Sequence, residues 1–339
     1  MATDTAAPPT VSPGPRVTVS RGLVTILVAV VALFVASAVL APTSLDRGAL
    51  LGMLPFAAVL AIAAIGQTLV VQQGGIDLSV PGAISLAVVI TTHEPQGDDS
   101  RLLSALALGL VVAVVAGVVN GVLVGRLGLN AIVATLGTNA LLYAAVLGIS
   151  AGSPRRTTDL MAAVGGGLTF GVPNSVYVAL AVVVVATVAM KLTVPGRRFE
   201  AIGTNPAAAA ATALPVVRHR AGAYVWAQIL YWLAGVLLAG IIAQPTAFQG
   251  DSYLLPSVAA VVLGGTSLLG GRGYLVATAV AALFLSQLDQ FVLALGVSFA
   301  IRTLVEAAAL TVGVALYSLN WRGIRQRFTG RTPALGAAS

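Results

Sequence analysis

Long apolar stretches, separated by short polar segments, run along almost the whole chain. An α-helix needs about 20 mostly apolar residues to cross the hydrocarbon core of a membrane. Dividing the chain where proline, glycine and charged residues cluster predicts ten such spans. They cover residues 22–41, 51–72, 78–92, 102–124, 131–150, 174–192, 221–242, 255–269, 273–289 and 298–319. Two of them, 255–269 and 273–289, are short enough to be half-helices or re-entrant elements.

The composition supports a membrane protein and excludes two other classes. Of the 339 residues, 58% are apolar and 9% are charged, whereas soluble domains have about 25% charged residues. An intrinsically disordered chain needs low hydrophobicity and high charge, and this chain has the reverse. The predicted fold class is therefore an all-α polytopic membrane protein with about ten transmembrane helices, some of them broken or re-entrant.

The distribution of basic residues predicts the orientation in the membrane. Lys and Arg total 18 against 11 acidic residues, and the positive-inside rule places loops rich in Lys and Arg in the cytoplasm. With ten spans, thirteen of the 18 fall on the side that carries both termini, and four fall on the other side. We therefore expect both the N- and C-termini to be cytoplasmic. Residues 193–220 would form the longest cytoplasmic loop.

The two ends of the chain are predicted to be tails outside the membrane. Residues 1–21 contain four prolines and are expected to form a disordered cytoplasmic tail, and residues 320–339 a basic cytoplasmic tail. A cleavable signal peptide is the alternative for the N-terminus, because Ala36-Ser37-Ala38 resembles a cleavage site. The apolar run there exceeds the roughly 7 to 15 residues usual in a signal peptide, which favours an uncleaved first span.

Several kinds of site are excluded or disfavoured by the residue inventory. The chain has no cysteine, so disulfides and thiolate metal sites are excluded. His93 and His219 have no partner at metal-ligand spacing, so no metal site is expected. No phosphate-loop motif is present, so any energy from ATP must come from another chain. Basic residues lie in short loops rather than on one face, which argues against nucleic acid as a partner, and we expect no catalytic residues and no cofactor.

Polar residues interrupt the apolar pattern between residues 67 and 82. They are Gln67, Gln72, Asp77 and Ser79. Polar groups at membrane depth usually face a cavity or the interior of a helix bundle, so a pathway role is one interpretation. Helix punctuation is the other: Gly74 and Gly75 would end one helix, and Asp77 or Ser79 would cap the next. The two interpretations are compatible, because a break between half-helices is a common way to build a transporter site.

A second glycine-rich segment, residues 262–273, breaks a later apolar stretch. Its Gly264-Gly-Thr-Ser-Leu sequence parallels Gly74-Gly-Ile-Asp-Leu, and residues 127–136 parallel residues 295–304 at a different offset. Internal duplication with an unequal number of helices would explain both parallels. Chance similarity among Leu, Gly and Ala is the alternative.

A few further polar residues lie inside the predicted spans. They are Asn120, Gln228, Gln287, Asp289, Arg302 and Glu306. Arg302 and Glu306 are four residues apart and therefore share one helical face, where they would neutralise each other. Such an isolated ion pair is typical of a structural role rather than of ion conduction.

Two basic clusters flank a run of alanines between residues 193 and 220. Asn205 followed by Pro206 is a favourable N-cap and first helical residue, and alanine is the strongest helix former. Residues from about 205 to 213 should therefore form a short helix. This helix would either rest on anionic lipid headgroups or serve as a docking surface for a cytoplasmic subunit.

Five segments, in order along the chain, carry a resemblance to a known family. They are Gly74-Gly-Ile-Asp-Leu-Ser79, Asn120-Gly, Asn130 with Thr135-Leu-Gly137, Gly196-Arg-Arg-Phe-Glu-Ala-Ile-Gly-Thr-Asn205, and Ala259-Ala-Val-Val-Leu-Gly-Gly-Thr-Ser-Leu-Leu-Gly-Gly-Arg-Gly273. Together they resemble the permease subunits of bacterial ABC importers for simple sugars, of the ribose, xylose, arabinose and galactose type. The resemblance covers roughly residues 50–319.

The resemblance implies an all-helical permease domain, residues 22–319, that works with a second permease copy or a paralogue. It also implies a cytoplasmic ATP-binding subunit and an extracytoplasmic substrate-binding protein as partners. In that family the 193–220 loop would hold the coupling helix that contacts the ATPase. The implied coupling residues are Arg197, Arg198, Glu200, Gly203, Asn205 and Leu214. The implied translocation-path residues are Gln67, Gln72, Asp77, Ser79, Asn120, Asn130 and Thr135.

The predicted function is that of a non-enzymatic transmembrane subunit of an ATP-driven importer, for a monosaccharide or a related polyol. The nearest alternative is a nucleoside permease of the same kind. The alternative from another class is a stand-alone secondary transporter, in which Asp77 or Asp289 would titrate as the coupling group.

Overall fold

The computed structural model describes residues 21–298 except 154 and 243, together with residues 300, 301, 304, 307, 308 and 311. Seven helices in this part of the chain are long and apolar enough to cross a membrane. They are α1 (Arg21–Leu40), α2 (Arg47–Gln72), α4 (Leu102–Asn120, continued by a π-helical turn over Gly121–Arg126), α5 (Ala131–Ser150), α7 (Asn174–Leu192), α10 (Val216–Ile241) and α12 (Leu275–Ala294). Two shorter apolar helices, α3 (Val80–His93) and α11 (Leu254–Leu263), lie between them in sequence. The prediction of an all-α polytopic membrane protein is confirmed.

The helices agree with nine of the predicted spans, but the lengths of α11 and α12 differ from the prediction. Helix α12 is a full-length helix, so the prediction that 273–289 forms a half-helix is wrong. Helix α11 is the short one, ending six residues before the predicted 269, because Gly265 turns the chain at φ +89°, a conformation that glycine adopts readily. The tenth predicted span, 298–319, with Arg302 and Glu306, falls largely outside the described residues, as do the tails at 1–20 and 320–339.

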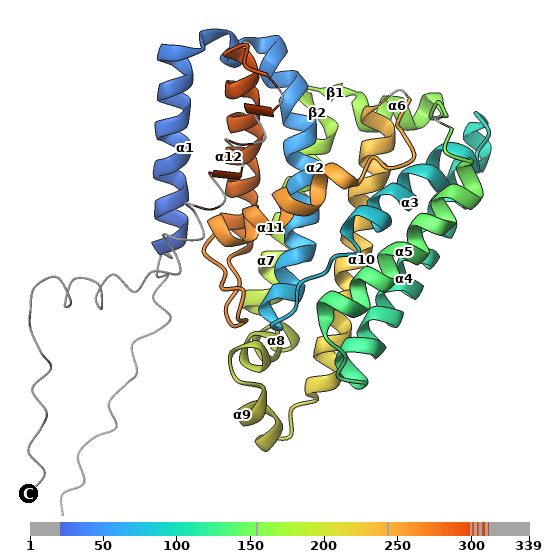
Figure 1. Ribbon diagram of the computed structural model, residues 1–339, viewed down its shortest axis with the longest axis vertical. Coiled ribbons are helices and arrows are strands. Elements are labelled where there is room, and N and C mark those ends of the chain that lie inside the picture. The colour runs from blue at the N-terminus through green and yellow to red at the C-terminus, as the bar shows by residue number, and fades with distance from the viewer. Residues whose placement is uncertain are drawn as a thin grey trace, which may run out of the picture.

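Helices α2 and α10 form the centre of the bundle (Figure 1). Helix α10 packs against α2, α3 and α4, and α2 also packs against α7, α11 and α12. Helices α1 and α12 lie on one side of this pair, and α4 and α5 lie on the other (Figure 1). The outward faces of α1, α4, α5 and α7 carry exposed Val, Leu and Ile side chains, as expected of surfaces in contact with lipid.

Glycines allow α4 and α10 to approach closely. Gly117, Gly121 and Gly125 repeat every fourth residue and therefore lie on one face of the helix. A Cβ at Gly117 would lie 2.5 Å from the Cα of Val225, and one at Gly121 would lie 2.8 Å from the carbonyl oxygen of Ala221. Small residues at this spacing are a common means of packing transmembrane helices, because the backbones can then come into direct contact.

Two short helices project from one end of the bundle, and a small hairpin covers the opposite end (Figure 1). The projecting helices are α8 (Val194–Thr204) and α9 (Pro206–Ala211). The hairpin consists of β1 (Leu168–Thr169) and β2 (Val172–Pro173) and follows α6 (Asp159–Gly166). Within the loop predicted at 193–220, the short helix expected from about 205 to 213 is confirmed as α9, although it ends at Ala211.

Helix α8 was not predicted, and its formation depends on packing as well as on local sequence. The Thr193 hydroxyl caps it by accepting a hydrogen bond from the Gly196 N–H at 3.2 Å. Its Phe199 and Ile202 side chains are buried against the bundle; Phe199 joins a cluster that includes Ile65 and Leu69 of α2. Helix α8 therefore lies directly on the end of α2.

Candidate functional site

The chain between α2 and α3 is a sharp break inside the bundle. Helix α2 ends at Gln72, and Gly74 turns the chain at φ +79°, which glycine adopts at little cost. Residues 75–79 then lead to the start of α3, and Asp77 and Ser79 on this segment are fully buried. The Gly-Gly pair thus ends the first helix, as predicted.

The start of α3 is held both by Asp77 and by α5. Oδ1 of Asp77 accepts from the Ser79 N–H at 2.9 Å, which agrees with the predicted cap, whereas the Ser79 side chain makes no capping hydrogen bond. On the α5 side, the Gly82 N–H donates to Oδ1 of Asn139 at 2.8 Å. The Leu78 N–H donates to the hydroxyl of Thr135 at 2.9 Å. The amide groups at this helix start, which must find partners when buried, are therefore satisfied in part by Asp77 and in part by a neighbouring helix.

The side chains of Asp77 and Ser79 also form a buried polar cluster with α4 and α10. The Ser79 hydroxyl donates to Asp77 Oδ1 at 2.5 Å and accepts from Gln228 Nε2 at 2.7 Å and Asn120 Nδ2 at 3.1 Å. Gln228 Nε2 also lies 3.4 Å from Asp77 Oδ2. Thr138 of α5 completes the cluster by donating to Asn120 Oδ1 at 2.5 Å. Four elements are thus joined at one point, deep within apolar helices.

Gln67 holds the backbone of the break from the α2 side. Its amide, oriented so that both of its groups are satisfied, forms two hydrogen bonds of 3.2 Å to the N–H and carbonyl of Asp77 and donates to the Tyr231 hydroxyl at 2.8 Å. Gln67, Asp77 and Tyr231 are all fully buried. A buried polar network whose members are paired in this way fixes a unique local arrangement.

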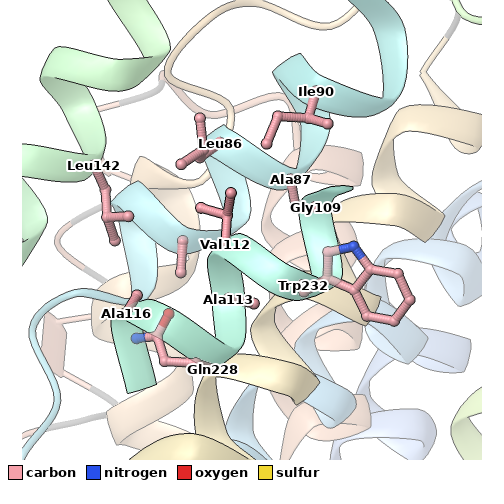
Figure 2. A pocket seen from close by; sticks show the side chains of 11 residues that line it. Leu86, Ala87, Ile90, Gly109, Val112, Ala113, Ala116, Leu142, Gln228 and Trp232 are labelled. Carbon is pink, nitrogen blue, oxygen red and sulfur yellow. The ribbon is translucent and has the colours of Figure 1, made fainter. Parts of the chain in front are cut away.

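A small cavity adjoins the cluster between α3, α4, α5 and α10. Its volume is about 10 Å³, which is about the space that one water molecule needs. Figure 2 shows Gln228 and Trp232 of α10 beside the apolar side chains of α3 and α4 that line it. This cavity is too small to hold a sugar.

Helix α8 contacts the break through the last residues of α2. Gln73 Nε2 donates to the carbonyl of Phe199 at 3.0 Å. The carbonyl of Gln72 accepts from the Gly271 N–H at 3.0 Å, and a Cβ at Gly203 would lie 2.3 Å from the same oxygen. The end of α2, helix α8 and the second glycine-rich segment therefore meet at Gln72.

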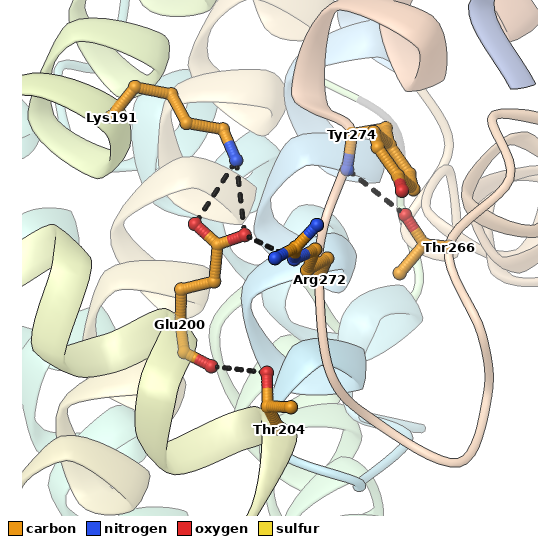
Figure 3. Close-up of polar contacts among 6 residues, drawn as sticks. All are labelled: Lys191, Glu200, Thr204, Thr266, Arg272 and Tyr274. Atoms are coloured by element: carbon orange, nitrogen blue, oxygen red, sulfur yellow. Dashed lines mark hydrogen bonds and ion pairs between the residues drawn. The ribbon is translucent and has the colours of Figure 1, made fainter. Parts of the chain in front are cut away.

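Glu200 of α8 forms ion pairs with Lys191 of α7 and with Arg272 of the second glycine-rich segment, as Figure 3 shows. Lys191 Nζ lies 3.1 Å from Glu200 Oε2, and Arg272 Nε lies 3.5 Å from Glu200 Oε1. The Lys191 side chain is 46% exposed and that of Arg272 is 74% exposed, so solvent screens both pairs and each contributes less than about 1 kcal/mol. Their role is to orient the 264–273 segment against α8 rather than to stabilise the fold strongly.

The surface beside Glu200 is an open groove between α8 and α9. Its volume is about 540 Å³, and its lining includes Arg197, Asn205 and Leu214. Asn205 also caps α9, accepting from the Ala208 N–H at 3.0 Å. Arg198 is exposed on α8. The six predicted coupling residues thus lie on α8 or in the α8–α9 region.

Five of the seven predicted path residues lie at the break, namely Gln67, Asp77, Ser79, Asn120 and Thr135. Gln72 lies instead where α2 meets α8. Asn130 is exposed and caps α5, accepting from the Ile132 N–H at 2.9 Å, so it is not part of the buried cluster. Sequence reasoning missed the roles of Thr138, Asn139 and Tyr231; the signal for Asn139 was its four-residue spacing from Thr135 on one face of α5.

Comparison with known proteins shows that this chain is similar to ABC transporter permeases. A protein-family model described as the permease component of branched-chain amino acid transport systems matches residues 49–318. A probable ABC transporter permease of Sinorhizobium fredii, y4mJ, is 33% identical over 87% of this chain and 89% of its own length. The ribose import permease RbsC of Escherichia coli is 34% identical, over 85% and 91% respectively. The autoinducer 2 import permease LsrD of Photorhabdus temperata is 31% identical, over 76% and 80%. No solved structure matches.

Proposed function

The chain belongs to the family of permease components of branched-chain amino acid transport systems, and from this premise we propose that it imports a monosaccharide or a related polyol. It is a transport subunit of an ABC transporter in the plasma membrane, with ATP hydrolysis on a separate chain. The choice of substrate class rests on the relatives named for ribose and autoinducer 2 import. Both termini and the α8–α9 end would face the cytoplasm, in keeping with the excess of basic residues on that side.

The contact between α8 and the end of α2 is the observation that carries the proposed mechanism. Helix α8 projects from the bundle, yet it bonds directly to Gln73 and packs against Gln72. A force applied to α8 by an ATP-binding subunit would therefore reach the break without passing through a flexible linker. The same force would reach the 264–273 segment through Gly271 and Arg272.

At the other end of the break, the polar cluster around Ser79 would act as the closed gate. Its internal hydrogen bonds hold α3, α4 and α10 together in this conformation. When α8 moves, these bonds would be exchanged for bonds to the hydroxyls of a passing sugar, since Asp77, Asn120 and Gln228 offer both donors and acceptors. A passage of this kind binds its substrate weakly, because release must be as easy as entry.

Affinity purification in mild detergent, with mass spectrometry of the bound chains, tests the proposal first. We expect an ATP-binding chain with phosphate-loop motifs in stoichiometric amount, and a second permease chain, either another copy or a paralogue. Charge reversal of Arg197 and Arg198 should weaken this association, because both are exposed on α8. Charge reversal of Arg47, at the opposite end of α2, is the matched control.

Transport by the purified complex in proteoliposomes, with its substrate-binding protein, then tests the substrate class. We expect uptake of an aldose such as D-ribose that requires ATP. Uptake of L-leucine or of a nucleoside instead would contradict the substrate class. Uptake by the chain alone, driven by a proton gradient and lost in Asp77→Asn, would replace the importer with a secondary transporter.

A further inference from the structure

The connection between α10 and α11 descends into the bundle from the end opposite α8. Helix α10 has 26 residues and is therefore about 39 Å long, so its last residue lies far from α9. The following segment, residues 244–253, then reaches α3: the Gly250 N–H donates to the Ser85 hydroxyl at 2.9 Å, and a Cβ at Gly250 would lie 2.2 Å from the carbonyl of Pro81. Pro81 and Ser85 belong to the first two turns of α3.

This segment places a carboxylate and an aromatic ring against Tyr143 of α5, below the ends of the helices. The Tyr143 hydroxyl of α5 donates to a carboxylate oxygen of Asp251. The rings of Tyr143 and Phe248 are 5.1 Å apart and perpendicular. Tyr143 precedes the last residue of α5 by seven positions, which corresponds to about 10 Å along the helix. Asp251 therefore lies within the depth of the apolar helices.

The carboxylate in this cluster argues that its exposed surface faces water rather than lipid. Asp251 is exposed, and Phe248 is 39% exposed. A carboxylate at membrane depth is costly unless it faces a water-filled cavity or a partner, and Tyr143 occupies only one of its roughly four acceptor positions. Within the part of the chain that the structure describes, no other group bonds to this carboxylate, so its remaining acceptor positions are open to a ligand from the aqueous side.

A polar stripe on α5 connects this cluster to the break. Thr135, Asn139 and Tyr143 are spaced four residues apart and share one face of the helix. Thr135 bonds to the Leu78 N–H and Asn139 to the Gly82 N–H, while Tyr143 bonds to Asp251. Polar groups of α5 thus lead from the break to Asp251 along one face of the helix.

From this arrangement we propose that Tyr143, Phe248 and Asp251 form an outer subsite for a polyhydroxylated ligand. The Asp251 carboxylate accepts hydrogen bonds from neighbouring hydroxyls of the ligand, and the exposed face of Phe248 packs against the C–H groups of its ring. The proposal rests on the proposed function, because it assigns a first contact for the same sugar before it reaches the break. The class of ligand follows from the combination of an aromatic surface and a carboxylate with free acceptor positions.

The subsite is held in place before a ligand arrives. Gly250 is fixed against α3, and the Gln249 side chain accepts from the N–H and hydroxyl of Thr246 at 3.2 and 3.1 Å. The perpendicular packing of Phe248 on Tyr143 fixes both rings. Because these groups lose little freedom on binding, little of the contact energy is spent on ordering the subsite.

The absence of native cysteine allows a direct binding test on the full transporter complex. Ser252→Cys, next to Asp251, would introduce the only thiol of this chain, and Thr43→Cys in the distant 3₁₀ turn Pro42–Leu45 serves as the control. We expect D-ribose and D-xylose at millimolar concentration to slow maleimide labelling of the Ser252→Cys variant and not of the Thr43→Cys variant. Adding Asp251→Asn or Phe248→Leu to Ser252→Cys should raise the half-protecting sugar concentration about tenfold or more, as expected for loss of one principal contact.

The result that would overturn the subsite is equally specific. Variants that elute and melt like the parent yet retain full protection would remove Phe248 and Asp251 from the site. Equal slowing of labelling in both thiol variants, or protection by L-leucine in place of the aldoses, would do the same. Persistent ATP-driven sugar uptake without protection at position 252 rejects the subsite alone, whereas lack of ATP-driven sugar uptake in the unaltered complex rejects the proposed function.

Discussion

Replacing Gly203 with alanine tests whether the contact between α8 and the end of α2 transmits motion to the break. A Cβ at Gly203 would lie 2.3 Å from the carbonyl oxygen of Gln72, whereas ordinary contacts begin at 3.4 Å. The oxygen belongs to the backbone and the position of a Cβ is fixed by the backbone, so neither atom can rotate away as the end of a long side chain would. Helix α8 must therefore move outward by about 1 Å, because the close-packed interior transmits such strain.

The consequence of that movement can be worked out from the neighbouring hydrogen bond. Gln73 Nε2 lies 3.0 Å from the carbonyl of Phe199 on α8, and a shift of about 1 Å would place these atoms beyond hydrogen-bonding distance. Overpacking and loss of this bond together cost about 1–3 kcal/mol of stability. The larger effect falls on coupling, and we expect the sugar imported per ATP hydrolysed to decrease about tenfold or more, as for other 1 Å misplacements of a working element.

The assay measures uptake and ATP hydrolysis in the same proteoliposomes. Gly222→Ala, in the first turns of α10, is the matched control, because no atom lies within 4 Å of a Cβ at that position and alanine is the better helix former. The reasoning is refuted if Gly203→Ala imports as much sugar per ATP as Gly222→Ala does. Loss of complex assembly would be detected separately by the amount of co-purified ATP-binding chain.

Two further predictions concern the packing and the polar cluster. Gly117→Leu should lower the melting temperature in detergent strongly, because its Cβ would lie 2.5 Å from the Cα of Val225. Gly148→Leu is the control and should have little effect, because a Cβ there has nothing within 4 Å. Equal melting temperatures of the two variants would contradict the packing argument. Gln228→Leu removes the donor 2.7 Å from the Ser79 hydroxyl and should lower the free energy of unfolding by about 1–3 kcal/mol. An unchanged melting temperature would show that the cluster does not hold the helices together.

Helix α8 illustrates why part of the fold could not be predicted from sequence. Its residues include Pro195, Gly196, Gly203 and three charged side chains, a composition typical of a loop. It is helical because Phe199 and Ile202 bury themselves against the end of α2 and because Thr193 caps its first turn. Tertiary burial therefore outweighs weak local propensity here.

At the candidate site too, the sequence identifies individual polar residues but not the distant residues that they contact. Asp77, Ser79 and Asn120 were predictable, because polar residues stand out in apolar spans. The partnership of Ser79 with Gln228 joins residues 149 positions apart, and no local pattern encodes that distance. Asn130, placed on the path from sequence, is an exposed helix cap, because a polar residue before an apolar helix has the same appearance in either role.

The sequence by itself determined the class of the protein, most of its spans and the position of the break, because a membrane demands long apolar helices and makes every glycine or polar interruption conspicuous. Only the tertiary structure decided what the interruptions contact. It brought Asn139 of α5 to the first turn of α3, α4 and α10 to Ser79, and α8 to Gln72. These outcomes depend on how the helices pack, and helix packing is determined by complementary surfaces distant in sequence rather than by the periodicity of any one segment.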